Sequence, residues 1–259
     1  PQSFQFATIG GFAATRSSGQ DSAGYGRFDD MVRGVRVISP AGVLDVGRDE
    51  AETLVNLATT ESIGEQSITG GCLAITLFEG TPAHSESRHA ETRAVLETHG
   101  GTSLGEEPAR AWEHGRFNAP YLRDSLLAAG ALCETLETAT NWSNLAALKT
   151  AVTEALLAEL GPALVMCHIS HVYPTGASLY FTVVAAQHDN PIEQWRRAKT
   201  AASEAMVRAG GTITHHHAVG ADHRPWMRAE IGDLGVDVLR AVKATLDPAG
   251  ILNPGKLIP

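Results

Sequence analysis

The sequence predicts an α+β fold in which helices cover one face of an antiparallel sheet. Helical and strand-like patterns alternate from about residue 51 onward, and apolar runs occur in pairs around short turn-forming connections. One such pair covers 163–172 and 178–186, with a Pro- and Gly-containing connection over 173–177. Runs joined this closely are typical of antiparallel strands, and helices of the same domain need an apolar face to cover.

The first 48 residues differ from the rest in their high glycine content between residues 10 and 26. The runs 35–38 and 43–46, which flank Pro40-Ala41-Gly42, predict a hairpin. Glycines permit tight turns and let a ligand approach the main chain closely. We therefore expect one domain over 1–50, a second that caps it over 51–225, and a C-terminal helix and tail over 226–259.

The second domain is expected to begin with a strand over 72–78 and a helix over about 84–99, which ends at Gly100-Gly101. Helices over 121–131 and 144–160 follow, with a strand over 132–138 between them. The second of these helices carries apolar residues on one face, namely Leu145, Leu148, Val152, Leu156 and Leu160.

The last elements are a helix over 192–209, a short strand near residue 214, and a closing helix over 226–246 that stops before Pro248. Apolar residues of the closing helix recur at helical spacing and are expected to face inward, namely Ile231, Leu234, Val238 and Val242.

Three consecutive histidines, His215, His216 and His217, are the strongest indication of chemistry. Their β-branched neighbours predict a short strand, on which His215 and His217 would share a face. Imidazole exchanges protons near neutral pH, which suits general acid–base work. Buried structural histidines and a metal site are the alternatives, although nearby residues lack the usual spacing of zinc ligands.

Composition excludes several classes of protein. The formal net charge of −9 and the pI near 5.6 argue against a nucleic-acid partner, which requires clustered Lys and Arg. Cys72, Cys133 and Cys167 are odd in number and widely spaced, as expected for reduced thiols. The chain has no apolar stretch of about 20 residues that would span a bilayer. We expect a cytoplasmic location.

Both ends of the chain resemble the FAD-linked oxidases of the vanillyl-alcohol oxidase superfamily. Residues 6–12 and 15–19 are similar to the second FAD-contacting stretch of that family, and the tail over 247–257 is similar to its common ending. The triplet, in Thr214 to Gly220 with Trp226 following, resembles the triple-histidine motif of the alkyldihydroxyacetonephosphate synthases within it. FAD is the cofactor that this resemblance implies.

The resemblance also implies roles for single residues. Tyr180 and the three histidines would be catalytic, Arg123 would bind a substrate phosphate, and Thr135 would line the substrate site. A guanidinium can grip a phosphate with two hydrogen bonds, whereas an isolated arginine of this kind usually pairs with a carboxylate. The residues expected to contact FAD are Gln2, Ser3, Phe4, Gln5, Phe6, Ala7, Thr8, Thr15, Arg16, Ser17 and Ser18.

The 2-hydroxyacid dehydrogenases of the superfamily differ at the hairpin around residue 175, where they carry two metal-binding histidines. His171 stands at the first of these positions, but Tyr180 stands where the second histidine would be. A phenol is a poor zinc ligand and a usable proton donor or acceptor. This departure favours the synthase reading, with no metal.

Two blocks of the family pattern are absent from this sequence. The glycine-rich loop that cradles the FAD pyrophosphate should precede residue 1, and a further block should lie between Val46-Gly47-Arg48 and Ala51-Glu52-Thr53. Their loss would leave strand edges unpaired in the FAD domain. We therefore expect that the chain omits segments of the full family domain, so that residues 1–50 are only part of it.

The resulting hypothesis is an FAD-dependent enzyme that exchanges the acyl chain of acyl-dihydroxyacetone phosphate for a long-chain alcohol in ether lipid synthesis. Its partner would be a small lipid substrate, and peripheral membrane contact and a homodimer remain open. One alternative is an FAD-dependent dehydrogenase or oxidase of a 2-hydroxy acid or another alcohol, which shares the fold. Another is a binding scaffold without cofactor.

Overall fold

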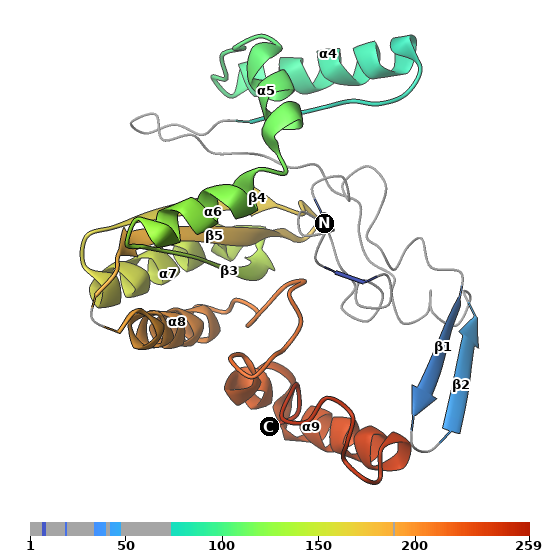
Figure 1. The fold of residues 1–259 in the computed structure, drawn as a ribbon. Coiled ribbons are helices and arrows are strands. Elements are labelled where there is room, and N and C mark those ends of the chain that lie inside the picture. The colour runs from blue at the N-terminus through green and yellow to red at the C-terminus, as the bar shows by residue number, and fades with distance from the viewer. Residues whose placement is uncertain (1–6, 9–18, 20–33, 40–41, 48–73, 189) are drawn as a thin grey trace.

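The structure, a computed structural model, describes residues 7, 8, 19, 34–39, 42–47, 74–188 and 190–259. Its elements, drawn in Figure 1, are β1 (Gly34–Ser39), β2 (Gly42–Gly47), α4 (Pro82–Thr98), α5 (Glu107–Gly115), α6 (Ala119–Ala128), β3 (Ala131–Asn141), η3 (Trp142–Asn144), α7 (Leu145–Leu160), β4 (Ala163–Ser170), β5 (Gly176–Ala186), α8 (Pro191–Arg208), η4 (Arg224–Trp226) and α9 (Met227–Leu246). The glycine-rich stretch over 10–26 and the domain boundary predicted at residue 50 fall outside these residues, apart from Gly19. The domain division stays a prediction.

The site-bearing part of the molecule is a three-stranded antiparallel sheet in the order β3-β5-β4. Helices α7 and α8 lie together on one side of it (Figure 1). This arrangement confirms the α+β class and the antiparallel sheet covered by helices. The hairpin predicted in the first 48 residues is also confirmed, because β1 and β2 pair with Val35 opposite Val46.

The core lies between the sheet and these two helices. Leu148, Val152, Leu156 and Leu160 repeat every four residues, so α7 presents one continuous apolar face, and all four are buried. Burial of such a side chain stabilises the fold by about 1.5–3 kcal/mol. The strands contribute the alternate residues of β5, which are Ala177, Leu179, Phe181, Val183 and Ala185.

Helix α8 packs closely against this layer because its buried side chains are small. Ala198 and Ala202 are fully buried and leave room for the neighbouring helix, while Met206 fills the space further along. The helix begins where the side chain of Asn190 accepts a hydrogen bond from the Glu193 amide at 3.1 Å, and Pro191 occupies its first turn.

The other face of the sheet is the one that carries the candidate chemistry. Side chains alternate along a strand, so the residues between the core positions point away from α7 and α8. Glu137 of β3 and His168 of β4 both pair with Tyr180 of β5, and directly opposite residues share a face. A carboxylate, a phenol and an imidazole therefore form one row across the sheet.

Three expectations about the elements are wrong. Residues 74–78 form no strand, and the histidine triplet lies in an irregular connection between α8 and η4 rather than on a strand. The apolar residues of α9 are not buried among the described residues; Leu234, for example, is 78 % exposed. Helix α9 is also interrupted at Gly232, whose φ of 73° lies in the left-handed region. Helix α5 was not expected.

Candidate active site

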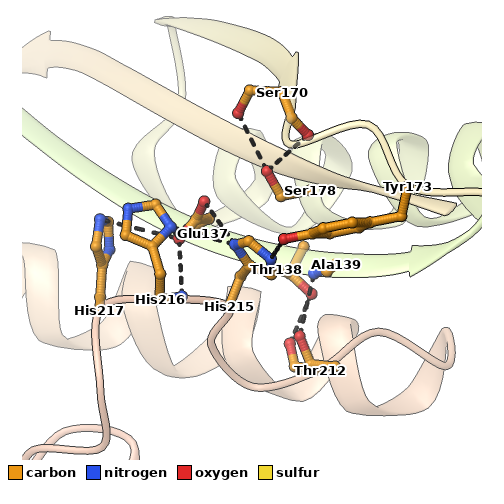
Figure 2. A network of polar contacts seen from close by, with 10 residues as sticks. All are labelled: Glu137, Thr138, Ala139, Ser170, Tyr173, Ser178, Thr212, His215, His216 and His217. Carbon is orange, nitrogen blue, oxygen red and sulfur yellow. Dashed lines mark hydrogen bonds and ion pairs between the residues drawn. The ribbon is translucent and has the colours of Figure 1, made fainter. Parts of the chain in front are cut away.

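A buried carboxylate, Glu137, lies at the centre of the site. Its residue is 1 % exposed, and it projects from the middle of β3 on the face away from the core helices. A charged side chain is seldom buried unless other groups compensate it. The compensation here comes from the histidine triplet, whose rings stand side by side next to the carboxylate (Figure 2).

The connection that carries the triplet is fixed to the edge of β3 by hydrogen bonds from both sides. Thr138 Oγ1 donates to the Thr212 carbonyl at 2.6 Å, and the Ala139 amide donates to Thr212 Oγ1 at 3.1 Å. Gly211 must lack a side chain, since a Cβ there would lie 2.6 Å from Thr138 Oγ1 and 2.8 Å from Leu148. The close approach of Gly211 and Thr212 to β3 places the three histidines that follow next to this strand.

The three imidazoles meet the carboxylate at different distances. His216 Nδ1 lies 2.8 Å from Glu137 Oε2, His215 Nδ1 lies 3.5 Å from Oε1, and His217 Nε2 lies 3.9 Å from Oε2. The His216 amide also approaches Oε2, at 3.4 Å. The His216 contact is the shortest of the three, and the Nδ1 atoms of His215 and His216 also lie within hydrogen-bond distance of each other, at 3.2 Å. Oε1 is left without a hydrogen bond of ordinary geometry.

Burial by itself would raise the pKa of Glu137, because desolvation disfavours the charged form. The interactions of the carboxylate with the imidazoles, foremost the hydrogen bonds with His215 and His216, outweigh burial, so the pKa falls far below its usual range. Glu137 is therefore ionised at neutral pH and accepts hydrogen bonds.

The turn between β4 and β5 adds two more rings to the cluster. Tyr173 Oη lies 2.7 Å from His215 Nε2, a hydrogen bond drawn in Figure 2. The ring of His171 lies 5.1 Å from those of His215 and His216, between centroids. His171 has a φ of 46°, an uncommon backbone conformation for a residue other than glycine.

Tyr180 lies beside the other end of the triplet. Its ring makes an edge contact with that of His217, at 5.7 Å between centroids and 83° between planes. Burial raises the pKa of the Tyr180 phenol, in spite of a hydrogen bond with the Thr135 side chain that lowers it. Partial burial lowers the pKa of His217. At neutral pH the phenol keeps its proton, and burial disfavours protonation of that imidazole.

Arg123, the predicted phosphate ligand, lies on helix α6 and contacts the first residues of β3. Its Nη2 donates to Glu134 Oε1 at 2.7 Å, and its Nε donates to the Cys133 carbonyl at 3.2 Å. Cys133 is four residues from Glu137, which corresponds to roughly 13 Å along a strand. The guanidinium is thus bound to a carboxylate in this structure, and its role toward a substrate stays a prediction.

The described residues bring four potential metal ligands together. Ligand atoms of Glu137, His171, His215 and His216 all lie within 4.8 Å of one another. One carboxylate and three imidazoles form a donor set that zinc and related ions accept. A metal site was one alternative considered for the triplet, and His171 was considered separately, but the sequence did not indicate that they would meet at Glu137.

The residues predicted to contact FAD lie almost entirely outside the part of the chain that the structure describes. Ala7 and Thr8 are the exceptions, and both are exposed. The described residues offer phenol and imidazole donors on one face of the sheet, the kind of groups that act on a substrate held beside a cofactor ring.

Comparison with known families decides the family of the chain. Residues 40–257 match the model of the C-terminal domain of FAD linked oxidases, and residues 1–47 match an FAD binding domain. The chain belongs to the FAD-linked oxidase family. Membership confirms FAD as the cofactor and an FAD-dependent enzyme as the class of protein.

Relatives within this family carry the name alkyldihydroxyacetonephosphate synthase. Those of Trypanosoma brucei brucei and Dictyostelium discoideum are each 26 % identical to this chain, over 352 and 353 residues. The alignments cover 100 % of this chain and 57 % and 58 % of the two relatives, so the chain spans little more than half their length. Both alignments are longer than the chain's 259 residues, so the relatives contain residues that this chain lacks within the aligned region. This agrees with the expected absence of an internal block.

A solved structure with the same name supports the fold. It superposes with a TM-score of 0.66 at 22 % sequence identity, over 98 % of this chain and 59 % of that one. The family match and the two named relatives confirm the resemblance to an alkyldihydroxyacetonephosphate synthase-like FAD-linked oxidase, and the solved structure adds agreement of fold.

The site includes two residues that the sequence analysis missed, Glu137 and Tyr173. Neither belongs to a recognisable motif, and Glu137 lies in a strand that also carries Glu134. The usable signal was the strand pairing, because the antiparallel register sets Glu137 opposite Tyr180. A carboxylate facing a candidate catalytic phenol is a candidate for the same site.

Proposed function

We propose that this chain is the catalytic part of an enzyme similar to alkyldihydroxyacetonephosphate synthase, which exchanges the acyl chain of acyl-dihydroxyacetone phosphate for a long-chain alcohol. The observation that carries the proposal is the gathering of Tyr180 and the triplet at one buried carboxylate. Tyr180 and the triplet come from separate segments of the chain, and the sequence motifs predict one site for them.

FAD, when bound, would supply the reactive ring at which the dihydroxyacetone phosphate carbon is activated. Contacts to it are proposed for residues 2–8 and 15–18, which match the family's FAD-binding segment. The residues of the sheet face would act on the substrate side.

Tyr180 would manage the proton at the reacting carbon. A phenol whose pKa is raised by burial keeps its proton at neutral pH, so it donates a hydrogen bond or a proton before it can accept one. Its ring lies in edge contact with that of His217, and burial favours the neutral form of this imidazole. A hydrogen bond with the Thr135 side chain also holds the phenol.

Arg123 would anchor the phosphate of the substrate. The guanidinium is 43 % exposed, and an anion can compete with Glu134 for it, because exposed ion pairs are weak. A phosphate would take two parallel hydrogen bonds in place of the carboxylate.

The proposal also covers the cellular location, membrane contact and oligomeric state of the enzyme. A lipid substrate implies contact with a membrane surface, and none of the helices in the described residues is long and apolar enough to cross one. We propose a cytoplasmic enzyme with peripheral membrane contact, active as a homodimer.

The test is an exchange assay with the purified full-length protein. Acyl-dihydroxyacetone phosphate and a radiolabelled C16 alcohol are incubated with it under anaerobic conditions, with Tyr180→Phe as the matched control. The proposal predicts labelled alkyl-dihydroxyacetone phosphate and an equal amount of free fatty acid, without net reduction of the flavin. Absence of the ether product from flavin-replete protein refutes it.

A second candidate is an FAD-dependent dehydrogenase or oxidase of a 2-hydroxy acid or another alcohol. It is favoured by one observation, the four ligand atoms that lie within 4.8 Å of one another, His171 among them. A bound divalent ion would hold the hydroxyl and carboxylate of such a substrate. Anaerobic bleaching of the flavin by a 2-hydroxy acid, abolished by a chelator, would select this function over the exchange reaction.

A further inference from the structure

Four side chains of the site that can bind a metal ion converge on one point. They come from three segments of the chain, and their ligand atoms all lie within 4.8 Å of one another. The members of this four-ligand cluster are Glu137, His171, His215 and His216. Glu137 is buried, yet its Oε1 has no hydrogen-bond partner among the described residues. A buried acceptor left without a partner costs free energy, and a cation beside Oε1 would account for its position.

The two imidazoles nearest the carboxylate present the same nitrogen to it. His215 Nδ1 lies 3.5 Å from Glu137 Oε1, His216 Nδ1 lies 2.8 Å from Oε2, and the two Nδ1 atoms are 3.2 Å apart. In a tetrahedral zinc site with bonds of about 2.0–2.1 Å, neighbouring ligand atoms are separated by roughly 3.3–3.4 Å. The measured separations lie on both sides of this value, so one ion can bind all three groups after shifts of about half an ångström.

The outer nitrogen of His215 is held as that of a metal ligand usually is. Its Nε2 lies 2.7 Å from Tyr173 Oη (Figure 2). A histidine that binds a metal through one nitrogen commonly makes a hydrogen bond to an oxygen through the other, and this bond fixes the orientation of the ring. Because Tyr173 occupies Nε2, Nδ1 is the nitrogen of His215 that an ion can take.

His171 completes the four-ligand cluster from the turn between β4 and β5. The centroid of its ring lies 5.1 Å from that of His215 and 5.1 Å from that of His216. This set differs from the pair of hairpin histidines of the 2-hydroxyacid dehydrogenases, because position 180 carries tyrosine and the carboxylate comes from β3.

The chemistry of the donors selects the class of ion. Magnesium and calcium are bound mainly by oxygen ligands, whereas three imidazoles and one carboxylate suit zinc and the neighbouring divalent transition metals. The carboxylate of Glu137 offsets one of the two positive charges of such an ion. The side chains of His215 and His216 keep 12 % and 13 % of their exposure, so the ion can enter from solvent.

We propose that the four-ligand cluster is a binding site for a divalent transition-metal ion such as zinc, and that an ion bound there inhibits the exchange reaction. Two of the ligands, His215 and His216, have catalytic roles in the proposed function, and a neutral imidazole that is coordinated through one nitrogen has no lone pair left to accept a proton. Four protein ligands also complete a tetrahedral shell, so no open position remains for a substrate oxygen. The inhibition rests on the proposed function, whereas the site does not.

The first test measures binding and needs no activity. Zinc is titrated into chelator-treated, flavin-replete full-length protein in competition with a chromophoric chelator, and X-ray absorption then gives its coordination. One zinc ion per chain is expected, with a dissociation constant of about 1 μM or tighter and four nitrogen and oxygen neighbours at about 2.0–2.1 Å. Excess magnesium should leave this affinity unchanged. Failure to bind zinc in this range, or a shell of six oxygens, overturns the proposal.

Substitutions identify the ligands. His171→Gln and His216→Gln are each expected to weaken zinc binding by about 100-fold or more, because the loss of an outer hydrogen bond to a ligand alone costs about 10–100-fold. Tyr173→Phe removes such a bond from His215 and should weaken binding about tenfold or more. Far-ultraviolet circular dichroism confirms that each variant is folded, and parental zinc affinity in both histidine variants overturns the proposal.

The matched controls are two histidines outside the four-ligand cluster. His217 belongs to the triplet, and His168 lies in the same row across the sheet as Glu137 and Tyr180. His217→Gln and His168→Gln should each leave the zinc affinity within about threefold of the parent, since ligand loss costs far more. Equal losses at these positions and at the ligands would show diffuse binding to imidazoles and contradict the assignment.

The exchange assay tests the inhibition. One bound zinc ion is expected to lower kcat about 100-fold or more, because it removes an acid–base contribution of about 10²–10⁴-fold, and a chelator should restore the rate. His171→Gln should keep its own zinc-free rate at a zinc concentration that inhibits the parent. Undiminished exchange in the zinc-saturated parent contradicts the inhibitory role. If the metal-free parent forms no ether product, the proposed function fails, and the zinc titration still decides whether the site exists.

Discussion

Thr138 offers a direct measure of how firmly the fold holds the triplet. The residue is fully buried, and its Oγ1 donates to the Thr212 carbonyl three residues before His215. Valine has nearly the same shape as threonine, so Thr138→Val deletes this hydrogen bond without opening a cavity. It leaves the carbonyl in a part-buried position without its donor.

The expected loss follows from two contributions. A net hydrogen bond is worth about 1 kcal/mol, and a buried acceptor left unsatisfied costs about 1–3 kcal/mol. Because Thr212 is only part-buried, the lower end applies, and we expect the free energy of unfolding to fall by about 1.5–2 kcal/mol. In a chain of this size the Tm would fall by roughly 3–8 °C.

The matched control is Thr140→Val, two residues further along the same strand. Thr140 Oγ1 donates to the Gly210 carbonyl at 3.0 Å, but at an exposed position where water can replace it. We expect about 0.5 kcal/mol there. Urea unfolding at equal m-values measures both, and kcat should fall only in Thr138→Val, since only its bond adjoins the triplet. Equal destabilisation by the two substitutions would show that this reasoning is wrong.

Four further outcomes follow from the site. Tyr180→Phe should abolish exchange while its Tm stays within about 3 °C of the parent. The ring contact with His217 remains, and the lost hydrogen bond is worth about 1 kcal/mol. Turnover near the parental rate would contradict the catalytic role of Tyr180. Arg123→Lys should raise KM for the phosphate-bearing substrate about tenfold or more at nearly constant kcat, since an ammonium cannot make the paired hydrogen bonds of a guanidinium; an unchanged KM in initial-rate assays would argue against a phosphate site. Dialysis against a chelator should leave exchange unchanged within twofold, and loss of activity with stoichiometric release of a metal would favour the dehydrogenase. The pKa of Glu137 is lower in the folded than in the unfolded protein, so its ionised form stabilises the fold fully above about pH 4.5 and this stabilisation is lost as the pH falls toward the folded-state pKa. The urea midpoint of the parent should therefore decline more steeply between pH 6 and 3 than that of Glu137→Gln. Parallel declines would contradict this linkage.

The elements that the sequence predicted correctly are those whose pattern is local. In α7 the repeat of Leu148, Val152, Leu156 and Leu160 fixes both the helix and its buried face within four turns. The strands β4 and β5 were recognisable because a short connection with Pro174 and Gly176 forces neighbouring apolar runs to pair. No information from distant parts of the chain is needed in either case.

The failures share a dependence on distant partners. The β-branched residues around Ile213 indicate a strand, but a strand needs a ladder of main-chain bonds. Thr212 meets β3 largely through side-chain hydroxyls, so the segment runs along the sheet edge without extending it. In α9 the apolar periodicity predicts a face but not what covers it, and Leu234 and Val238 stay exposed among the described residues.

The location of Glu137 exposes the limit of sequence reasoning most clearly. Along β3 it follows Glu134 by three residues, and nothing in the local pattern separates the two. Glu134 remains partly exposed and pairs with Arg123, whereas Glu137 is buried beneath imidazoles that lie 78 residues or more away in the chain. Its burial and its charge are consequences of tertiary structure alone.

This contrast bears on why the cluster exists. A carboxylate that loses its hydration must recover that free energy from donors, and the recovery here is incomplete because Oε1 lacks a well-formed hydrogen bond. An apolar residue at position 137 would pack against the sheet without any such cost, so stability does not account for the arrangement. Proton transfer gives a reason for a carboxylate buried beside imidazoles and a phenol, and this links the burial of Glu137 to the chemistry proposed for the FAD-linked oxidase.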